Sequence, residues 1–386
     1  MPEAVRGRHD GPTLISYLLH QYPHQQVTQP LLREQLWELG IAISAGQLSR
    51  ILTEDQETLH EEKAKVLDVG IETARYLQTD DTGARHRGQN GYCTYIGNER
   101  FAWFASPQSK SRINFLELLR ATHQDSVVNA GALEYMARQG LPKVKLAVLE
   151  TQGGGFATKA RWQAHLNGLG ITGPRHVRIA TEGAWMGSLL AQGFPVDMAI
   201  VSDDAGQFNV FEPALCWIHA ERGIHRLIPW NDAHRRAQSW IRRQMGNVYA
   251  DIKAYQTAPN AALKAKISAD FDALCATHTS FTTLNQALKR LHRNKAELLL
   301  VLDKPWLPLH NKLSERDIRE SVKQRKISGS PRSELGRQCR DTFTSLKKTC
   351  RKHGISFWEY LKDRVSRVNA IMPLPDVIRQ AVQAQA

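Results

Sequence analysis

Two short apolar runs each lead into acidic residues, and this pattern constrains the fold more than any other feature of the chain. Residues 76–79 precede Asp80, residues 198–202 precede Asp203, and a further aspartate follows each of these two. Short apolar runs bounded by polar residues are typical of buried strands. A carboxylate at the end of such a strand is held by the sheet and still reaches solvent. The pattern therefore predicts a sheet whose strand ends carry acidic side chains.

A third acidic residue, Glu315, lies on a helix predicted much later in the chain. Asp80, Asp203 and Glu315 are so far apart in sequence that only the fold could bring them together. Three converging carboxylates would hold Mg²⁺, which prefers oxygen ligands and keeps waters for a phosphate substrate. Two such ions could activate a water or a 3′-hydroxyl for in-line displacement. The alternative is that each carboxylate caps a turn or a helix.

The distribution of charge favours nucleic acid as the phosphate substrate. The chain has a formal net charge of +13, and residues 304–367 contain 17 Lys plus Arg against 7 Asp plus Glu. Clustered cations near Glu315 would neutralise backbone phosphates and release counterions, which makes binding sensitive to salt. The alternative is a solvated basic surface on ordinary helices.

Composition limits the cellular setting and the class of protein. The 386 residues are 42% hydrophobic and 23% charged, which is typical of a globular protein with more than one structural unit. The longest apolar stretch, 298–302, is too short for a membrane span, and residues 1–6 lack the apolar region of a secretory signal. Five widely spaced cysteines favour a reducing compartment over a disulfide framework. We therefore expect a cytoplasmic protein with no membrane partner.

The N-terminal region predicts helices arranged as a helix-turn-helix. Apolar residues recur at helical spacing through 13–66, and Gly40 interrupts them. Ser44 is placed to cap the following short helix, since its hydroxyl can accept a backbone N–H there. Gln47 and Arg50 would then face outward, where they could contact a groove edge or a phosphate. An ordinary helical hairpin is the alternative.

Beyond residue 74 the apolar period changes to two and then alternates with helical spacing. We expect strands at 76–79, 92–96, 101–105, 144–149 and 196–201, and a helix at 113–119. No strand signal interrupts the hundred residues after Asp203, for which we expect helices at 213–227, 232–256, 261–276 and 284–302. Residues 304–309 break this helical series, and a loop at 328–333 follows the helix that carries Glu315.

This pattern predicts an α/β fold, with a mixed sheet flanked by helices. An N-terminal helix-turn-helix region precedes the sheet, and an all-helical insertion precedes Glu315. The expected domains are 1–70, a helical DNA-binding region; 71–231, the first part of a catalytic core; 232–302, the helical insertion; and 303–386, the end of the core with basic C-terminal helices.

Three further motifs have weaker interpretations. Cys216 with His219, and Cys350 with His353, stand three apart and could share a helix face as zinc ligands, but neither pair has a second pair nearby. A packed Cys/His face explains them better. The glycine run 153–155 lacks the Gly-Lys-Ser/Thr of a phosphate loop and is read as a turn. The aromatic run 101–104 is read as sheet core, with base stacking by Trp103 as the alternative.

Taken in order, the motifs resemble those of DDE transposases with an RNase H-like core, and specifically the insertion-sequence sixty-six family. Five motifs of the family have counterparts in this chain. Asp-Glu-Thr corresponds to Asp80-Asp81-Thr82, the strand-terminal Asp-Gly to Asp203-Asp204, and Cys-Trp-x-His to Cys216-Trp217-Ile218-His219. Asn-Asn-x-x-Glu-Arg corresponds to Asn311-Lys312-Leu313-Ser314-Glu315-Arg316, and Tyr-Leu-Arg-Asp to Tyr360-Leu361-Lys362-Asp363. The resemblance extends from about Leu14 to Val365.

The resemblance implies specific roles for these residues. Asp80, Asp203 and Glu315 would bind two catalytic Mg²⁺ ions, for which Mn²⁺ could substitute. His219, Arg316 and Asn311 would support the site.

DNA contact is assigned to two groups of residues. Gln47 and Arg50 belong to the helix-turn-helix, and Arg325, Lys326 and Arg332 belong to the basic C-terminal region.

The chain departs from the family pattern at three positions. Asp81 and Asp204 replace Glu and Gly, and Lys312 replaces the second Asn before the glutamate. The first aspartate of each pair is the preferred ligand, because it matches the family position and is nearest the strand. Family members also commonly carry a longer cysteine-bearing region upstream, so a truncated copy stays an alternative.

The expected function is that of a transposase bound to bacterial nucleoid DNA. It would bind terminal inverted repeats in double-stranded DNA, nick them and join the freed 3′ ends to target DNA. A homodimer or a higher synaptic assembly would hold two ends together. Two alternatives remain: a catalytically inactive, transposase-derived DNA-binding protein, and an RNase H-like nuclease that cuts irrespective of end sequence.

Overall fold

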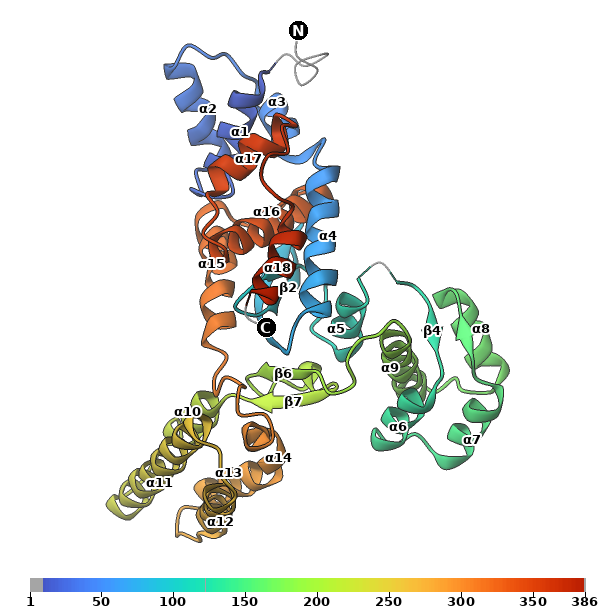
Figure 1. Cartoon of the computed structure of the whole chain (residues 1–386), viewed down its shortest axis with the longest axis vertical. Helices are drawn as coiled ribbons and strands as arrows, with labels where there is room; N and C mark the ends of the chain where they lie inside the picture. Colours follow the sequence, from blue (N-terminus) through green and yellow to red (C-terminus); the bar gives the residue numbers. More distant parts are fainter. Residues whose placement is uncertain (1–9, 122, 385–386) are drawn as a thin grey trace. The chain divides into compact units, whose positions relative to one another are not determined.

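The computed structural model describes residues 10–121 and 123–384. Residues 1–6, for which the sequence predicts no secretory signal, lie outside the described residues. The fold is α/β, with a mixed sheet flanked by helices, as predicted (Figure 1). Its contacts form two compact units. One contains the residues before Tyr76, Asp80–Val196 and the residues after Lys312; the other contains Tyr76–Thr79 and Asp197–Lys312. The domain boundaries expected from the sequence stay predictions.

The sheet has the strand order β3-β2-β1-β6-β7. Its strands are β1 (Tyr76–His86), β2 (Gln89–Gly97), β3 (Ala102–Ala105), β6 (Ala199–Ser202) and β7 (Glu212–Leu215). Strands β1 and β2 are joined by the two-residue turn Arg87-Gly88, in which both φ angles are positive, at +50° and +80°. That conformation suits a tight hairpin, because its twist matches the twist of the flanking strands.

In the second unit, residues 76–78 of β1 pair in parallel with Ala199–Val201 of β6, and β6 pairs in parallel with β7. The rest of this unit is helical: α10 (Trp217–His225), α11 (Asp232–Thr257), α12 (Ala261–Ala276), α13 (Thr282–Arg293) and α14 (Lys295–Leu298). Their apolar faces bury one continuous core that includes Ile241, Phe271 and Leu284. A smaller cluster, with Val201 and Leu307, joins the strands to the 304–309 segment.

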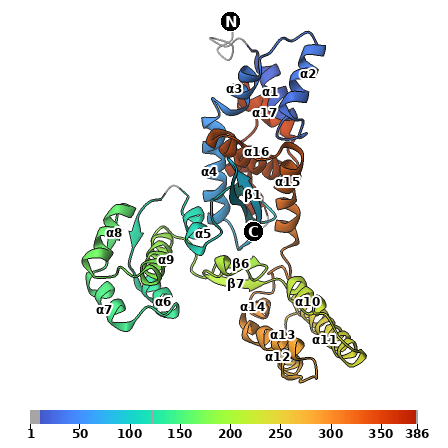
Figure 2. The same cartoon turned by 180° about the vertical axis from the view of Figure 1, so that it is seen from behind.

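In the first unit, the long helix α16 (Glu334–Lys352) lies between α4 (Glu57–Glu72) and α15 (Lys312–Ser328), against β3 (Figures 1 and 2). The backbone N–H groups of Ala102 and Phe104 donate to the hydroxyls of Thr349 (3.2 Å) and Ser345 (2.9 Å) on α16. Strand β3 is an edge strand, whose outward N–H groups would otherwise lack partners. Polar residues buried on α16 therefore close the edge of the sheet.

The same unit contains two further groups of helices. Around the small β4–β5 ladder (Ser126–Val127 with Gly155–Phe156) pack α6 (Ala130–Arg138), α7 (Lys143–Gln152), α8 (Lys159–Gly168) and α9 (Pro174–Ala191), and α9 also packs on α5 (Arg112–Leu119). At the N-terminal end are α1 (Pro12–Gln21), α2 (Gln29–Glu38) and α3 (Ala45–Thr53), with α1 packed on α17 (Phe357–Val365) and α18 (Leu374–Gln383) packed on α4.

Most predicted elements are confirmed, and two predictions are wrong. The strand predicted at 144–149 is the middle of helix α7, where Val144 is 78% exposed and Leu149 is buried. A run this short cannot be told from a one-sided helix by its apolar residues alone. The prediction that no strand follows Asp203 is also wrong, because Glu212–Leu215 form β7. Pro213 hid this strand, and it is tolerated because β7 lies at the edge of the sheet.

Among the residues that the structure describes, no helix combines the length and the hydropathy of a membrane span.

Candidate active site

Asp203 and Asp204 follow β6, and the structure gives them different surroundings. Asp203 is half-buried, and one of its carboxylate oxygens accepts the backbone N–H of Ala205 (3.2 Å). Asp204 is exposed, and its carboxylate forms an ion pair with Arg290 and accepts a hydrogen bond from Asn294 (3.3 Å). The side chain of Asp204 is thus directed to α13, which favours Asp203 as the metal ligand of the pair.

The backbone explains why the family has glycine after this aspartate. Asp204 has a φ of +74°, in the left-handed region that glycine adopts without steric cost. Aspartate is among the few other residues that tolerate this region. Asp204 therefore preserves the sharp turn that places Asp203 at the end of β6.

Asp80 lies on β1, just beyond the part of the strand that pairs with β6. It is half-buried, and its Oδ1 accepts the backbone N–H of Asp81 (2.8 Å). The register pairs Gln78 with Val201, and each of these residues precedes its motif aspartate by two positions.

Glu315 lies in the first turn of α15 and is half-buried, while Ser314 just before it is fully buried. Asp80 and Glu315 belong to one compact unit, and Asp203 belongs to the other.

Within the second unit, the segments that lead into all three motifs are hydrogen-bonded to one another. The bonds run from Gln78 Nε2 to the His310 carbonyl (3.3 Å), from the Trp217 N–H to the Leu309 carbonyl (3.0 Å), and from the Cys216 N–H to the Ser202 carbonyl (3.0 Å). The chain therefore enters Asp80, Asp203 and the Glu315 helix from one connected framework.

The expected supporting residues lie in this framework or next to it. His219 is half-buried on the first turns of α10, with its Nε2 3.5 Å from a guanidinium nitrogen of Arg222. Asn311 is only 1% exposed and immediately precedes α15, whereas Arg316 is exposed on that helix. Their roles stay predictions.

The donor set suits a hard cation, because aspartate and glutamate offer only oxygen. Across residues 10–121 and 123–384, however, no three His, Cys, Asp or Glu side chains are grouped as metal ligands. The two Cys/His pairs are not part of any such group within those residues. Cys216 and Cys350 are both buried, and burial raises the pKa of the Cys350 thiol, which opposes formation of the thiolate that zinc requires.

The inner face of α15 is fixed by buried ion pairs with α16. Lys347 contacts Glu320 (2.6 Å) and Lys352 contacts Asp317 (2.8 Å), and all four side chains are at most 9% exposed. Lys348 lies between them, 3.4 Å from Asp317 and 3.7 Å from Glu320. Part of the basic C-terminal region is therefore internal and neutralised, rather than available to a partner.

The outer face of α15 carries the opposite arrangement. Arg316, Arg319, Lys323 and Lys326 are all exposed, and their spacing of three, four and three residues places them on one side of the helix. In the described part of the chain, none of the four forms an ion pair with a carboxylate. We call these four residues the α15 stripe. It begins beside Glu315 and includes the predicted DNA-binding residue Lys326.

The other residues predicted to contact DNA lie in two places in the first unit. The hydroxyl of Ser44 accepts the N–H of Gln47 (3.0 Å), so the predicted helix cap is confirmed. Arg50 is exposed as expected, whereas Gln47 is half-buried and its amide donates to Asp10 (3.0 Å). Whether these helices bind DNA stays a prediction.

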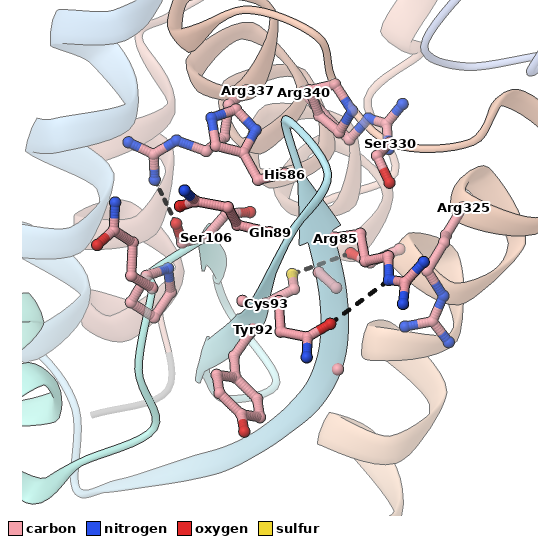
Figure 3. A pocket seen from close by; sticks show the side chains of 18 of the residues that line it. Arg85, His86, Gln89, Tyr92, Cys93, Ser106, Arg325, Ser330, Arg337 and Arg340 are labelled. Atoms are coloured by element: carbon pink, nitrogen blue, oxygen red, sulfur yellow. Dashed lines mark hydrogen bonds between the residues drawn. The ribbon is translucent and has the colours of Figure 1, made fainter.

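Arg325 and Arg332 line two neighbouring hollows of the same unit. Arg332 lines a groove of about 560 Å³ bordered by α2, α3 and α16. Arg325 lines a pocket of about 80 Å³ between the β1–β2 hairpin and the start of α16 (Figure 3).

One motif of the resemblance is structural. Tyr360 and Leu361 are fully buried on α17, and Asp363 accepts the backbone N–H groups of Ala370 (2.7 Å) and Ile371 (3.3 Å). Next to them, Arg364 pairs with Glu62 on α4 (2.9 Å). This motif fixes the C-terminal helices rather than contributing to the candidate site.

Several residues of these surfaces were not predicted. Arg319 and Lys323 could have been found from their spacing with Arg316 and Lys326 on one predicted helix. Arg85 and Arg340, which line the pocket with Arg325, come from distant segments, and no local pattern connects them.

Comparison with known proteins gives the family. Residues 183–338 match the family model described as the IS66 family of transposases, a stretch that includes Asp203 and Glu315 but not Asp80. A protein of Sinorhizobium fredii (strain NBRC 101917 / NGR234), described as uncharacterized protein y4jO, is 39% identical over 317 residues, which cover 81% of this chain and 99% of that protein. No solved structure matches the chain.

Proposed function

Because the chain belongs to the IS66 family of transposases, whose partner is DNA, we propose that it cleaves and joins DNA strands in a Mg²⁺-dependent reaction. Asp80, Asp203 and Glu315 would hold the metal in an RNase H-like core, and Mn²⁺ would substitute for Mg²⁺. The substrates would be the terminal inverted repeats of the element and a target duplex. A dimer or larger synaptic assembly would hold the two ends.

One observation carries this proposal. Hydrogen bonds within the second unit join the segments that lead into the three motif carboxylates, and β1 pairs in parallel with β6 just before Asp80 and Asp203. A rigid framework is what a metal site needs, since ligand geometry must be held while the substrate changes.

Different residues of the chain would bind the metal, fix the metal ligands and bind the DNA backbone. Metal bound by the carboxylates would lower the pKa of a water or 3′-hydroxyl and stabilise the leaving oxygen. Asp203 is kept in place by its hydrogen bond to Ala205, and α15 is kept in place by its inner ion pairs. The α15 stripe would bind backbone phosphates and position the strand beside Glu315.

Cleavage of DNA that carries the ends of the element tests the proposal. With Mg²⁺, the wild-type protein should nick at the ends, and Asp80→Asn should lose at least about 100-fold in rate because a metal ligand is lost. Asp81→Asn is the matched control and should retain most of the activity.

A DNA-binding protein without nuclease activity is the second candidate, because the exposed cations of the α15 stripe would bind backbone phosphates whether or not the carboxylates hold a metal. Specific binding of the ends without Mg²⁺-dependent cleavage would support that candidate. Cleavage that ignores the end sequence would instead indicate an RNase H-like nuclease.

A further inference from the structure

The pocket beside the β1–β2 hairpin belongs to neither the candidate metal site nor the α15 stripe. Its walls are the hairpin residues 82–93, the 106–108 segment after β3, Ser321 and Arg325 of α15, the 330–331 loop and the start of α16 (Figure 3). The turn of the hairpin is fixed to the loop, because the Arg87 N–H donates to the Pro331 carbonyl (3.3 Å). The pocket is therefore built from five segments of one unit.

Both carboxylates in the pocket wall already have partners. Glu334 forms an ion pair with Arg337, which holds the pKa of Glu334 below its ordinary value, and it also lies 3.4 Å from His86. Asp341 accepts the hydroxyl of Ser106 (2.7 Å), and the charge of Lys63 acts on it from α4. Neither carboxylate neutralises the remaining cations of the pocket.

Three arginines line the pocket without an acidic partner. The side chain of Arg325 has no hydrogen-bonding partner within the described residues, and the side chain of Arg85 reaches only the side-chain oxygen of Asn90 (3.4 Å). Arg340 donates to the Gly329 carbonyl (2.9 Å), which uses one of its five N–H donors. Figure 3 shows Arg85 and Arg325 on the same side of the pocket.

These features together select an anion. Like charges gathered in one pocket repel each other, and an anion relieves this repulsion while accepting the unused N–H groups. The pocket has room for about five waters, taking about 15 Å³ for each, so the oxygens of a phosphate group can enter it. The planar guanidinium forks match phosphate oxygens in pairs.

We propose that this pocket binds one backbone phosphate of the DNA strand that is cut, an inference that rests on the proposed function. Arg325, Arg340 and Arg85 supply the donors. The bound phosphate would fix the strand on the hairpin at a set distance from the candidate metal site.

Two elements of the same unit give that distance independently. Arg325 follows Glu315 by ten residues on α15, which is about 15 Å of helix. Arg85 follows Asp80 by five residues on β1, which is about 17 Å of strand. For a duplex whose axis runs parallel to these elements, at about 3.4 Å of axis per nucleotide, both distances correspond to four or five nucleotides from the cut.

Phosphate-by-phosphate neutralisation tests the proposal. The probe is a fluorescent duplex with the terminal inverted repeat that flanks the gene, in which single phosphates are replaced by neutral methylphosphonate. For the wild-type protein, one substitution four or five nucleotides from the cut should weaken binding about 10-fold, the loss expected for one charge-assisted contact. In Arg325→Gln and in Arg340→Gln, the same substitution should cause almost no further loss.

Arg161→Gln is the matched control, because Arg161 is exposed on α8 and its side chain has no partner among the described residues. It should show the wild-type pattern. The Arg325 side chain has no hydrogen bond or ion pair within the described residues to lose, so its variant should unfold near the wild-type temperature, which separates lost binding from misfolding. The proposal is overturned if the Arg325 and Arg340 variants lose affinity equally at every phosphate, if they behave like the control, or if the wild-type protein binds no DNA.

Two further outcomes separate this proposal from the proposed function. If the affinity loss at one phosphate disappears in the Arg325 and Arg340 variants, which shows their coupling to that phosphate, but the protein never cleaves DNA, the pocket proposal is supported and the proposed nuclease activity is contradicted. Metal-dependent cleavage without such coupling would support the nuclease and contradict the pocket. Competition by millimolar inorganic phosphate without coupling in the duplex would identify a site for a free anion, and this also overturns the proposal.

Discussion

Asp204 shows how a single residue can depart from a family pattern without changing the turn that the pattern encodes. Its φ of +74° is the conformation for which the family uses glycine, and its carboxylate is taken by Arg290. The sequence alone left open which aspartate of the pair binds metal. The backbone and the ion pair now favour Asp203.

This assignment predicts opposite outcomes for the two aspartates. Asp204→Gly restores the family residue, relieves the strained φ and loses only an exposed ion pair, so the free energy of unfolding should change by less than about 1 kcal/mol. DNA cleavage should stay near the wild-type rate, whereas Asp203→Asn should abolish it. Denaturant titration and the cleavage assay measure the two effects. Loss of cleavage in Asp204→Gly with normal stability would reverse the assignment.

At the scale of elements, α15 organises the C-terminal part of the candidate site. Its inner face pairs acidic residues with lysines of α16, and its outer face carries the stripe. Net charge along the sequence could not separate the two groups, because it ignores which face each residue occupies. Helical periodicity could have predicted the exposed face, but the inner pairs required knowing that α16 packs there.

The inner pairs should dominate the stability of this helix. Glu320→Gln leaves the Lys347 ammonium buried without its carboxylate, which should lower the free energy of unfolding by about 3–5 kcal/mol. Adding Lys347→Met should recover part of the loss. A smaller effect than that of a surface substitution would show that the pair is not buried in solution.

The same pair has a predicted pH dependence. Burial raises the pKa of Glu320, but the hydrogen bond and charge of Lys347, together with Lys348 and Gln26, outweigh burial and hold the pKa below its ordinary value of 4.5. The stabilisation is therefore present at neutral pH and is lost as the pH falls through this lowered pKa. The stability difference between the wild-type protein and Glu320→Gln should shrink below about pH 4 in urea titrations. A difference that grows with acidity would contradict this.

The α15 stripe gives a prediction about salt. If each of its cations neutralises one phosphate, Arg319→Gln and Lys323→Gln should each reduce the slope of log affinity against log salt by about 0.9 for duplex DNA. The effect should not depend on DNA sequence. Arg161→Gln is again the control, and an equal reduction in that variant would mean that the stripe is an ordinary solvated surface.

At the scale of the whole molecule, sequence patterns predicted the helices and strands better than the contacts between distant segments. The strands before Asp80 and Asp203 were found because apolar runs end there, and the helix of Glu315 was predicted after the helix break at 304–309. Strand β7 was missed because Pro213 masks it, and the packing of α16 against β3 was missed because it joins residues about 250 positions apart. Such contacts depend on tertiary packing, which local propensity does not encode.

The two compact units also define what the central claim requires of the molecule. Asp80 and Glu315 belong to one unit and Asp203 to the other, while the hydrogen bonds that lead into all three lie within the second. The proposed function requires all three carboxylates to bind the same metal ions. Mn²⁺ should raise the thermal stability of the wild-type protein more than that of Asp203→Asn, because a ligand stabilises only the state that binds it.

The most direct measurement is a crystal structure of the protein with its end DNA and Mn²⁺, analysed by anomalous scattering. The account predicts manganese peaks at about 2.0–2.2 Å from carboxylate oxygens of Asp80, Asp203 and Glu315, beside a DNA phosphate. Manganese bound elsewhere, or three carboxylates that share no ion in the DNA complex, would contradict it.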